Sequence, residues 1–505
     1  MKSCQLRPRP ILKLHARARL SHRFVVAAGC VALADWLFFG WEVGISLALF
    51  LGVLGVVAVV GNRVCPARKT QIIMTAVFLA GPLPLVEEVN FLSFCVGTLA
   101  TAMFIIVMTT PGATSWQRAL FEAITVPFRG PFQLAGDTIR ALRRMAVWIP
   151  GWLGWFMAWI VPLSVFAIFL ALFTSANPLI EYRLMQIDPR KLFALLNSWR
   201  LAFWIFIACL IWPLILRRIK SRAVLAGEPH RAVAAEAPEF DYLLGTQAMT
   251  RSLILFNALF ALQTGLDLTY LWGGASLPDG MSHAEYAHRG AYPLVATALL
   301  AAGFVLIAMR PGGPAEHSRL IRPLVLLWIG QNILLVISSI FRLDLYIAAY
   351  SLTYLRLAAF IWTGLVAAGL LLILLQIVLK KSNSWLISAN AATLALALYG
   401  CCFINAPSLI ASYNVEHCRE VAGTGASLDV YYLWSLGPHT LPALELHRER
   451  FPTYWVGMNK RQADVREAFT HSKNWRTWSF RAWRLKRYFA NNPATTPLSL
   501  DGGQG

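Results

Sequence analysis

The sequence predicts an all-α integral membrane protein, and two features of its composition lead to that prediction. Of its 505 residues, 57% are hydrophobic and only 14% are charged, whereas a soluble globular protein carries about 25% charged residues. Several apolar segments also reach the length of about 20 residues that a helix needs to cross a bilayer. This composition excludes a soluble enzyme, a nucleic-acid-binding protein and a disordered scaffold.

Apolar runs and the breaks between them predict a polytopic helical bundle with about eleven transmembrane helices. Gly81, Pro82 and Pro84 interrupt the third span, which we expect to be kinked or re-entrant. The predicted spans are 24–40, 43–61, 71–86, 89–109, 147–174, 199–216, 248–270, 291–309, 323–341, 346–379 and 384–405.

Five regions follow from this pattern. A basic cytoplasmic N-terminus (1–23) precedes a first membrane bundle (24–216), a cytoplasmic linker (217–247), a second membrane bundle (248–405) and a small helical C-terminal tail (406–505). Within the first bundle, residues 114–145 mix apolar and basic residues at helical spacing, which predicts one or two helices on the inner surface.

The distribution of basic residues predicts the orientation. With the N-terminus inside, the inner loops hold 26 Lys and Arg, the outer loops before residue 406 hold seven, and the tail holds twelve. Because Lys and Arg accumulate in cytoplasmic loops, we expect a cytoplasmic N-terminus and, with an odd number of spans, a periplasmic tail.

A cleaved N-terminal signal is the alternative reading of the first span. The segment Ala28-Gly29-Cys30 faintly resembles a lipoprotein cleavage site. Only six apolar residues precede Cys30, however, and Asp35 interrupts the run. We therefore favour an uncleaved first span.

The long loop after residue 266 supplies half of the candidate ligand-binding residues, which are Asp267, Tyr270, Glu285 and Arg289. His283 and His288 flank Glu285, but a spacing of five does not place two histidines on one helical face. We therefore predict no metal site and no cofactor. The alternative reading is a Gly-Gly turn followed by a short helix at the membrane interface.

A polar stripe at the start of the predicted tenth span supplies the other candidates. At 100° per residue, its five side chains share an arc of about 120°. An arginine deep in a membrane is costly unless it is paired or hydrated. Arg356 therefore predicts either a phosphate or carboxylate ligand, or pairing with Asp267 or Asp344. The stripe consists of Arg342, Tyr346, Tyr350, Thr353 and Arg356.

Two further groups of polar residues have structural explanations. The amides of the seventh and ninth spans are expected to bind neighbouring helices rather than a substrate. In the tail, residues 475–489 form an amphipathic basic helix, which either contacts anionic lipid or packs against other tail helices. The amides are Asn257, Gln263, Gln331 and Asn332.

Several short segments together resemble a known family. The chain is similar to a group of bacterial multi-pass membrane proteins that is defined only as a domain of unknown function, the 4173- and 4153-like group. The resemblance implies placement in the inner membrane and supplies no activity or catalytic residue. Ser351 stands where glycine is usual and is expected only to stiffen the start of a helix. The segments are 35–38, 175–178, 270–274, 284–290, 342–346, 352–356 and 436–438.

Three functions remain open. The leading hypothesis is a non-enzymatic envelope sensor or accessory protein whose outer loops and tail contact a ligand or partner. The sequence contains no phosphate-binding loop, zinc-protease motif or nucleophile elbow, but this excludes little, because membrane enzymes often use dispersed carboxylates and histidines. The second is a secondary transporter. The third is a membrane transferase that acts on a lipid-linked or phosphate-bearing substrate. In that case Asp35, Glu42, Asp267 or Glu285 would be the acid or base, and Arg342 and Arg356 would hold the phosphate.

Overall fold

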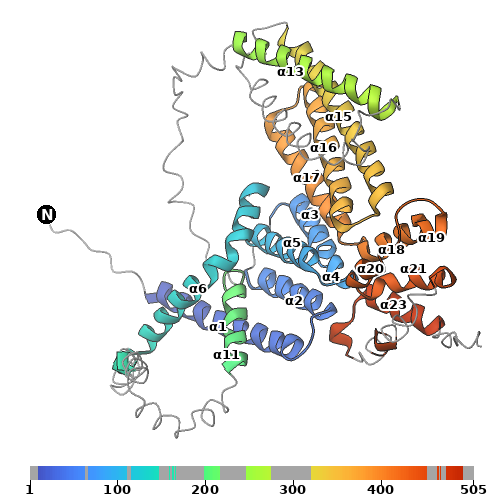
Figure 1. Ribbon diagram of the computed structural model, residues 1–505. Coiled ribbons are helices and arrows are strands. Elements are labelled where there is room, and N and C mark those ends of the chain that lie inside the picture. The colour runs from blue at the N-terminus through green and yellow to red at the C-terminus, as the bar shows by residue number, and fades with distance from the viewer. Residues whose placement is uncertain are drawn as a thin grey trace, which may run out of the picture. The chain divides into compact units, whose positions relative to one another are not determined.

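All regular secondary structure in the described part of the chain is helical (Figure 1). The structure is a computed structural model that describes residues 10–62, 66–110, 115–146, 198–215, 246–273, 320–451 and 474–492, with short pieces at 159, 162–163, 165–166, 463–465 and 467. The chain forms two compact units. Unit 1 contains residues 1–222 and 473–483, and unit 2 contains residues 223–472 and 484–505.

Seven described helices are long and apolar enough to cross a membrane, which supports the predicted class of protein. The predicted count of eleven is not confirmed. The predicted span 291–309 and most of 147–174 lie outside the described residues. The seven candidate spans are Ile45–Asn62, Arg68–Glu87, Phe91–Thr109, Gln247–Tyr270, Ile321–Tyr350, Tyr354–Val378 and Asn383–Cys401.

Unit 1 is built on α1 (Pro10–Phe38), α2 (Ile45–Asn62), α5 (Phe91–Thr109), α6 (Trp116–Ala146) and α11 (Ser198–Ile211). The predicted first and sixth spans fall on α1 and α11, which are not among the seven candidate spans. With 14 residues, α11 is shorter than the length of about 20 that a straight crossing needs. The core of the unit includes Leu54, Ile105 and Trp212.

The third predicted span is broken, as its Gly and Pro residues predicted. It consists of α3 (Arg68–Ala80) and α4 (Leu83–Glu87), which are separated at Gly81 and Pro82. Proline lacks the N–H that would continue the helical hydrogen bonds. At Gly81, an added Cβ would collide with Ala100, so this position also requires the absence of a side chain.

The predicted surface segment 114–145 is one helix, α6, with Pro127 and Pro131 inside it. One face packs against the other helices of unit 1 through Ala119, Ala123 and Gly130. Any side chain at Gly130 would strike the backbone of Cys209 in α11, so the two helices approach closely. The helical prediction is confirmed, and the location on the inner surface stays a prediction.

Unit 2 contains α13 (Thr246–Asp267) followed by a π-helical turn (Leu268–Trp272), α15 (Ile321–Tyr350), α16 (Tyr354–Val378) and α17 (Asn383–Cys401). The predicted boundary between the ninth and tenth spans, at residues 342–345, is wrong. Arg342 is buried and paired inside α15, so its charge does not end the helix. The chain instead leaves the helix at Ser351, where φ is +68°.

The intramembrane amides bind neighbouring helices, which confirms the prediction for two of them. Asn257 Nδ2 donates to the carbonyl of Leu324 at 3.1 Å, and Gln331 Nε2 donates to the carbonyl of Asn257 at 3.2 Å. These bonds join α13 to α15. Asn332 bonds within its own helix, to the carbonyl of Trp328.

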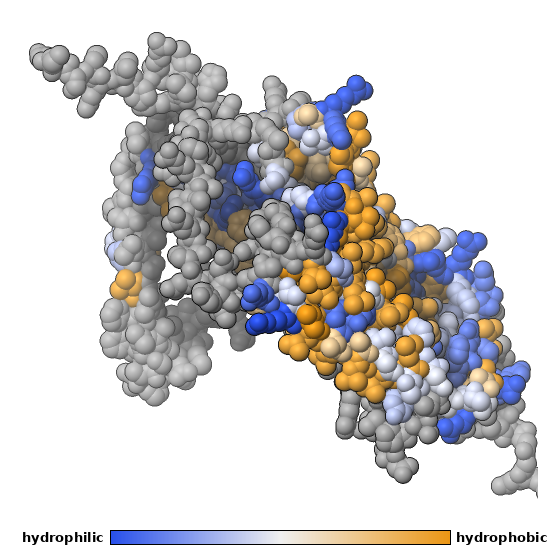
Figure 2. All heavy atoms as spheres, turned by 90° about the horizontal axis from the view of Figure 1, so that it is seen from above, coloured by the Kyte–Doolittle hydropathy of each residue, from blue (hydrophilic) through white to orange (hydrophobic). Residues whose placement is uncertain are grey.

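After α17, residues 402–451 form a folded group of short helices, here called the C-terminal layer. Its core includes Ile410, Val415, Leu433 and Leu444, all fully buried. Ile347 of α15 and Leu352 also belong to this core, so the layer packs against the end of α15. Many other apolar side chains are exposed, and Figure 2 shows large hydrophobic areas in orange on the molecular surface. The helices are α18 (Ala406–His417), α19 (Arg419–Ala422), α20 (Val430–Ser435) and α21 (Leu441–Leu446), with 3-10 turns at Pro438–Thr440 and Arg448–Arg450.

The rest of the described tail, a 3-10 turn (Trp475–Thr477) and α23 (Phe480–Asn491), packs against the protein. Leu485 and Phe489 join a small hydrophobic cluster with Leu441. The predicted bounds 475–489 are wrong, because the α-helix begins only at Phe480, but the packing alternative is supported for the apolar face of α23. Contact with anionic lipid stays a prediction.

Within unit 1, the start of this tail segment lies against two loops. The Ile45 N–H donates to the carbonyl of Trp478 at 2.9 Å. The buried Arg481 pairs with Glu87, the last residue of α4, and with Glu88, which follows it. The guanidinium of Arg476 stacks on the ring of Trp36 at 4.6 Å. Charged and aromatic contacts thus fix residues 475–481 to unit 1.

Candidate functional site

The structure brings most of the described candidate residues to one end of α15. Asp267 and Arg342 form a direct ion pair between α13 and α15, and Gln263 Nε2 donates to Asp267 Oδ1 at 3.0 Å. Asp267 is 1% exposed and Arg342 is 2% exposed. Since a buried charge must be paired, this arrangement fits a structural role in joining the two helices.

Arg356 binds the end of α15 instead of an acidic residue. Its Nη1 donates to the carbonyls of Tyr350, at 2.5 Å, and Ser351. The last carbonyls of a helix have no partner within the helix and carry partial negative charge, which a guanidinium satisfies. The prediction that Arg356 pairs with Asp267 or Asp344 is therefore wrong. Arg356 donates to main-chain carbonyls, and Asp267 pairs with Arg342.

The polar stripe predicted along the tenth span is not one helical face. α15 ends at Tyr350, and α16 begins after Thr353, whose side chain accepts a hydrogen bond from the Arg356 N–H. The residues still meet at the turn, because the Arg356 guanidinium lies 4.4 Å from the centre of the Tyr346 ring. We call residues 346–356 the α15–α16 corner.

Ser351 holds the corner in an uncommon backbone conformation. Its φ of +68° and ψ of +165° fall in a region that is favourable only for glycine. The expectation that serine here merely stiffens a helix start is therefore wrong, since Ser351 lies between two helices and is strained. The next residue is anchored, because the Leu352 N–H and carbonyl both bond to the side chain of buried Asn414, at 2.6 and 2.9 Å.

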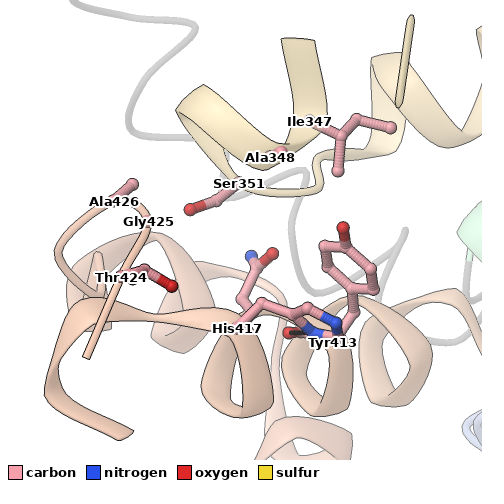
Figure 3. Close-up of a pocket in the computed structure, with 9 residues that line it drawn as sticks. Ile347, Ala348, Ser351, Tyr413, His417, Thr424, Gly425 and Ala426 are labelled. Atoms are coloured by element: carbon pink, nitrogen blue, oxygen red, sulfur yellow. Dashed lines mark hydrogen bonds between the residues drawn. The ribbon is translucent and has the colours of Figure 1, made fainter. Parts of the chain in front are cut away.

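Beside the corner lies a cavity of about 210 Å³. Figure 3 shows the side chain of Ser351 on one side of it, with Thr424, His417 and Tyr413 on the other. Three of these side chains carry hydroxyl groups, which both donate and accept hydrogen bonds. The lining residues are Ile347, Ala348, Ser351, Tyr413, Asn414, His417, Thr424, Gly425 and Ala426.

A glycine loop forms one wall of this cavity. Gly423 and Gly425 both have positive φ, and a Cβ on Gly425 would lie 2.6 Å from the carbonyl oxygen of His417. Only glycine lets the loop approach α18 so closely. The imidazole of His417 in turn stacks on Tyr413 at 4.2 Å, with its Nδ1 2.9 Å from the Tyr413 carbonyl oxygen.

The cavity is lined by uncharged side chains and by the imidazole of His417. Its lining contains no carboxylate, lysine or arginine. Burial, with a smaller contribution from the charge of Asp344, raises the pKa of the Tyr413 hydroxyl, which therefore stays protonated. No group of three or more possible metal ligands occurs among the residues that the structure describes. The cavity is suited to a small neutral polar molecule.

The remaining candidates lie elsewhere. Tyr270 is part of the π-helical turn after Asp267. Glu285 and Arg289 lie outside the described residues. Sequence reasoning missed His417 and Thr424, although Gly423 and Gly425 around Thr424 were a visible signal of a tight loop.

A comparison with protein families matches residues 72–447 to the family described as domain of unknown function DUF4153. The chain belongs to this family. The match includes α15, the α15–α16 corner and the lining of the cavity. No curated protein and no solved structure matches the chain.

Proposed function

We propose that this DUF4153 protein is a non-enzymatic sensor or accessory protein of the bacterial inner membrane. In this proposal, the cavity beside the α15–α16 corner receives a small neutral polar ligand. The cavity itself is the observation that carries the proposal, because polar groups surround a space of about 210 Å³ where a candidate span meets the C-terminal layer. A ligand in the cavity would contact the end of α15 and the C-terminal layer at the same time.

The pairing of two of the four acidic candidates supports a function without catalysis. Asp267 is buried against Arg342, and Asp35 accepts two hydrogen bonds from Arg200, of 2.5 and 2.8 Å. A general acid or base must reach its substrate. Neither carboxylate lines the cavity.

The contacts of residues 475–481 in unit 1 support a periplasmic location of this tail segment. The loop before α2, at Gly44 and Ile45, and the loop after α4, at Glu88, lie at the same end of successive helices if these helices cross alternately. The segment 475–481 contacts both loops. The opposite end carries the basic loop 63–69, which the positive-inside rule assigns to the cytoplasm. The tail would then lie outside.

Filling the cavity tests the ligand-binding part of the proposal. Ala348→Phe places a ring in the cavity, and Ala349→Phe adds the same ring to the neighbouring exposed position that does not line it. Thermal unfolding of the full chain in nanodiscs would be measured with a panel of polyols and monosaccharides. We expect at least one compound to stabilise the wild type and Ala349→Phe but not Ala348→Phe. If no compound separates the two variants, the proposal fails.

Labelling of an added thiol tests the orientation. Tyr431 is 72% exposed in α20, so Tyr431→Cys would be accessible to a membrane-impermeant reagent on the side where the layer lies. The native cysteines would be replaced, and the protein with no added thiol is the background. Labelling in intact cells is expected. Labelling only after permeabilisation would place the layer in the cytoplasm and overturn an envelope-facing role.

A further inference from the structure

The face of α6 that points away from unit 1 is covered by large apolar side chains. Phe128 is 73% exposed and Phe132 is 81% exposed, although neither belongs to a helix that qualifies as a span. At about 100° per residue, the exposed apolar residues share an arc of about 80° that lies opposite the buried face of the helix. The stripe consists of Phe121, Ile124, Phe128, Phe132 and Ile139.

Arginines follow one edge of this apolar stripe. Arg118, Arg129, Arg140 and Arg143 are all exposed, and the same geometry places them within an arc of about 60° next to the phenylalanines. Of the two acidic residues of α6, Asp137 is buried and pairs with both Arg23 and Arg140, and Glu122 is partly buried, so this side of the helix keeps a net positive charge. The exposed side of α6 is therefore both aromatic and basic.

We infer that this side of α6 lies on the anionic leaflet of the membrane, with the phenylalanines among the acyl chains and the arginines at the lipid phosphates. An amphipathic helix with a basic flank binds such a surface in two ways. Its apolar side chains are buried among the acyl chains, and its basic residues are attracted to the anionic lipid. Charge complementarity selects anionic lipid as the occupant. The inference concerns unit 1 and is independent of the cavity in unit 2.

The connection to α5 keeps α6 near the bilayer. α5 is a candidate span that ends at Thr109, and α6 begins at Trp116. A chain extends at most about 3.5 Å per residue, so Trp116 lies within about 25 Å of the end of that span. The opposite face of α6 is fixed to α11 at Gly130 and to α1 through the Asp137 pair with Arg23. The helix is thus held with its apolar stripe facing away from the residues of unit 1 that the structure describes.

Spin labelling tests where the stripe lies. The full chain, with its native cysteines replaced, would carry one label at Phe132→Cys or at Gln133→Cys, an exposed position on the arginine side. In nanodiscs of phosphatidylcholine with phosphatidylglycerol, we expect the label at position 132 to collide with oxygen and to be shielded from a water-soluble nickel chelate. The label at 133 should show the reverse. Access of nickel to position 132, or loss of collisions with both reagents through cover by protein, would overturn the inference.

A second measurement keeps all native cysteines. Selectivity for phosphatidylglycerol over phosphatidylcholine would be measured by mass spectrometry of the retained lipid. Arg118→Gln with Arg129→Gln is expected to lower this selectivity about twofold or more, because each basic residue near the surface attracts anionic lipid. The matched double variant Arg419→Gln with Arg450→Gln, in the C-terminal layer, should leave it unchanged. Equal selectivity of both double variants would contradict the inference.

Discussion

Two polar centres of the molecule differ in the space that lies beside their polar groups. In unit 1, Arg23 pairs with Asp137 at 2.7 Å, and the indole of Trp212 donates to the same carboxylate at 3.1 Å. All three residues are at most 5% exposed. In unit 2, the α15–α16 corner borders a cavity whose hydroxyl groups have room for a further partner. The first centre is suited to holding helices together, and the second has the properties of a binding site.

The distinction matters because both centres contain residues that a sequence search for function would select. A buried arginine in an apolar protein indicates function by default. In unit 1, however, Arg23 also donates to the Trp212 carbonyl at 2.5 Å and stacks on its ring at 4.5 Å. Charge alone therefore does not identify a site, and the presence of space beside polar groups is the better criterion.

Removal of Arg23 should have the largest effect. Arg23→Ala leaves the buried Asp137 paired only with the half-exposed Arg140, and breaking one partner of a buried pair costs about 3–5 kcal/mol. The free energy of unfolding would be measured in mixed micelles by denaturant titration. The control Arg68→Ala removes an exposed arginine at the start of α3 and should change stability by less than about 0.5 kcal/mol. Equal losses for both variants would show that the unit 1 centre is not structural.

Loss of the Asn414 side chain should have an intermediate effect. Asn414→Ala leaves the buried Leu352 N–H and carbonyl without their partners, which costs about 1–3 kcal/mol. Hydrogen exchange should increase at residues 351–353, since the corner is no longer tied to α18. Asn492→Ala, at an exposed position, is the control. Unchanged protection of the corner in Asn414→Ala would mean that another contact holds it.

The class of protein and many of the helices followed from the sequence, since long apolar runs have few alternatives. The boundary at Ser351 did not follow, because a strained φ depends on contacts such as those of Asn414 with Leu352. Arg356 was recognised as costly, but the pairing of Asp267 with Arg342 instead could not be read from the sequence, because α13 and α15 are far apart along the chain. The cavity was missed for the same reason, since its two sides come from segments about 60 residues apart.

A substitution at Ser351 should have a smaller effect of opposite sign. Relief of strain at such a backbone position would stabilise the folded state by about 1–3 kcal/mol. The greater freedom of glycine in the unfolded chain offsets about 0.5–1 kcal/mol of this gain. Ser351→Gly should therefore stabilise the protein by about 1 kcal/mol, seen as a rise in Tm, while Ser351→Ala keeps the strain and stays near the wild type. A lower Tm for Ser351→Gly would mean that the hydroxyl is needed for the fold of the corner.

Cys418 provides the smallest test, through the pH dependence of the C-terminal layer. Burial raises the pKa of its thiol above the ordinary value of 9.0. The folded state then holds this proton more tightly than the unfolded state, so stability is unaffected below about pH 9 and falls as the pH rises toward the folded pKa. The difference in unfolding free energy between wild type and Cys418→Ala should therefore be constant from pH 7 to 8.5 and shrink above pH 9. A difference that stays constant to pH 10.5 would show that the thiol does not titrate differently in the folded layer. It would also mean that the core beside the cavity is more open to water than the buried centre of unit 1.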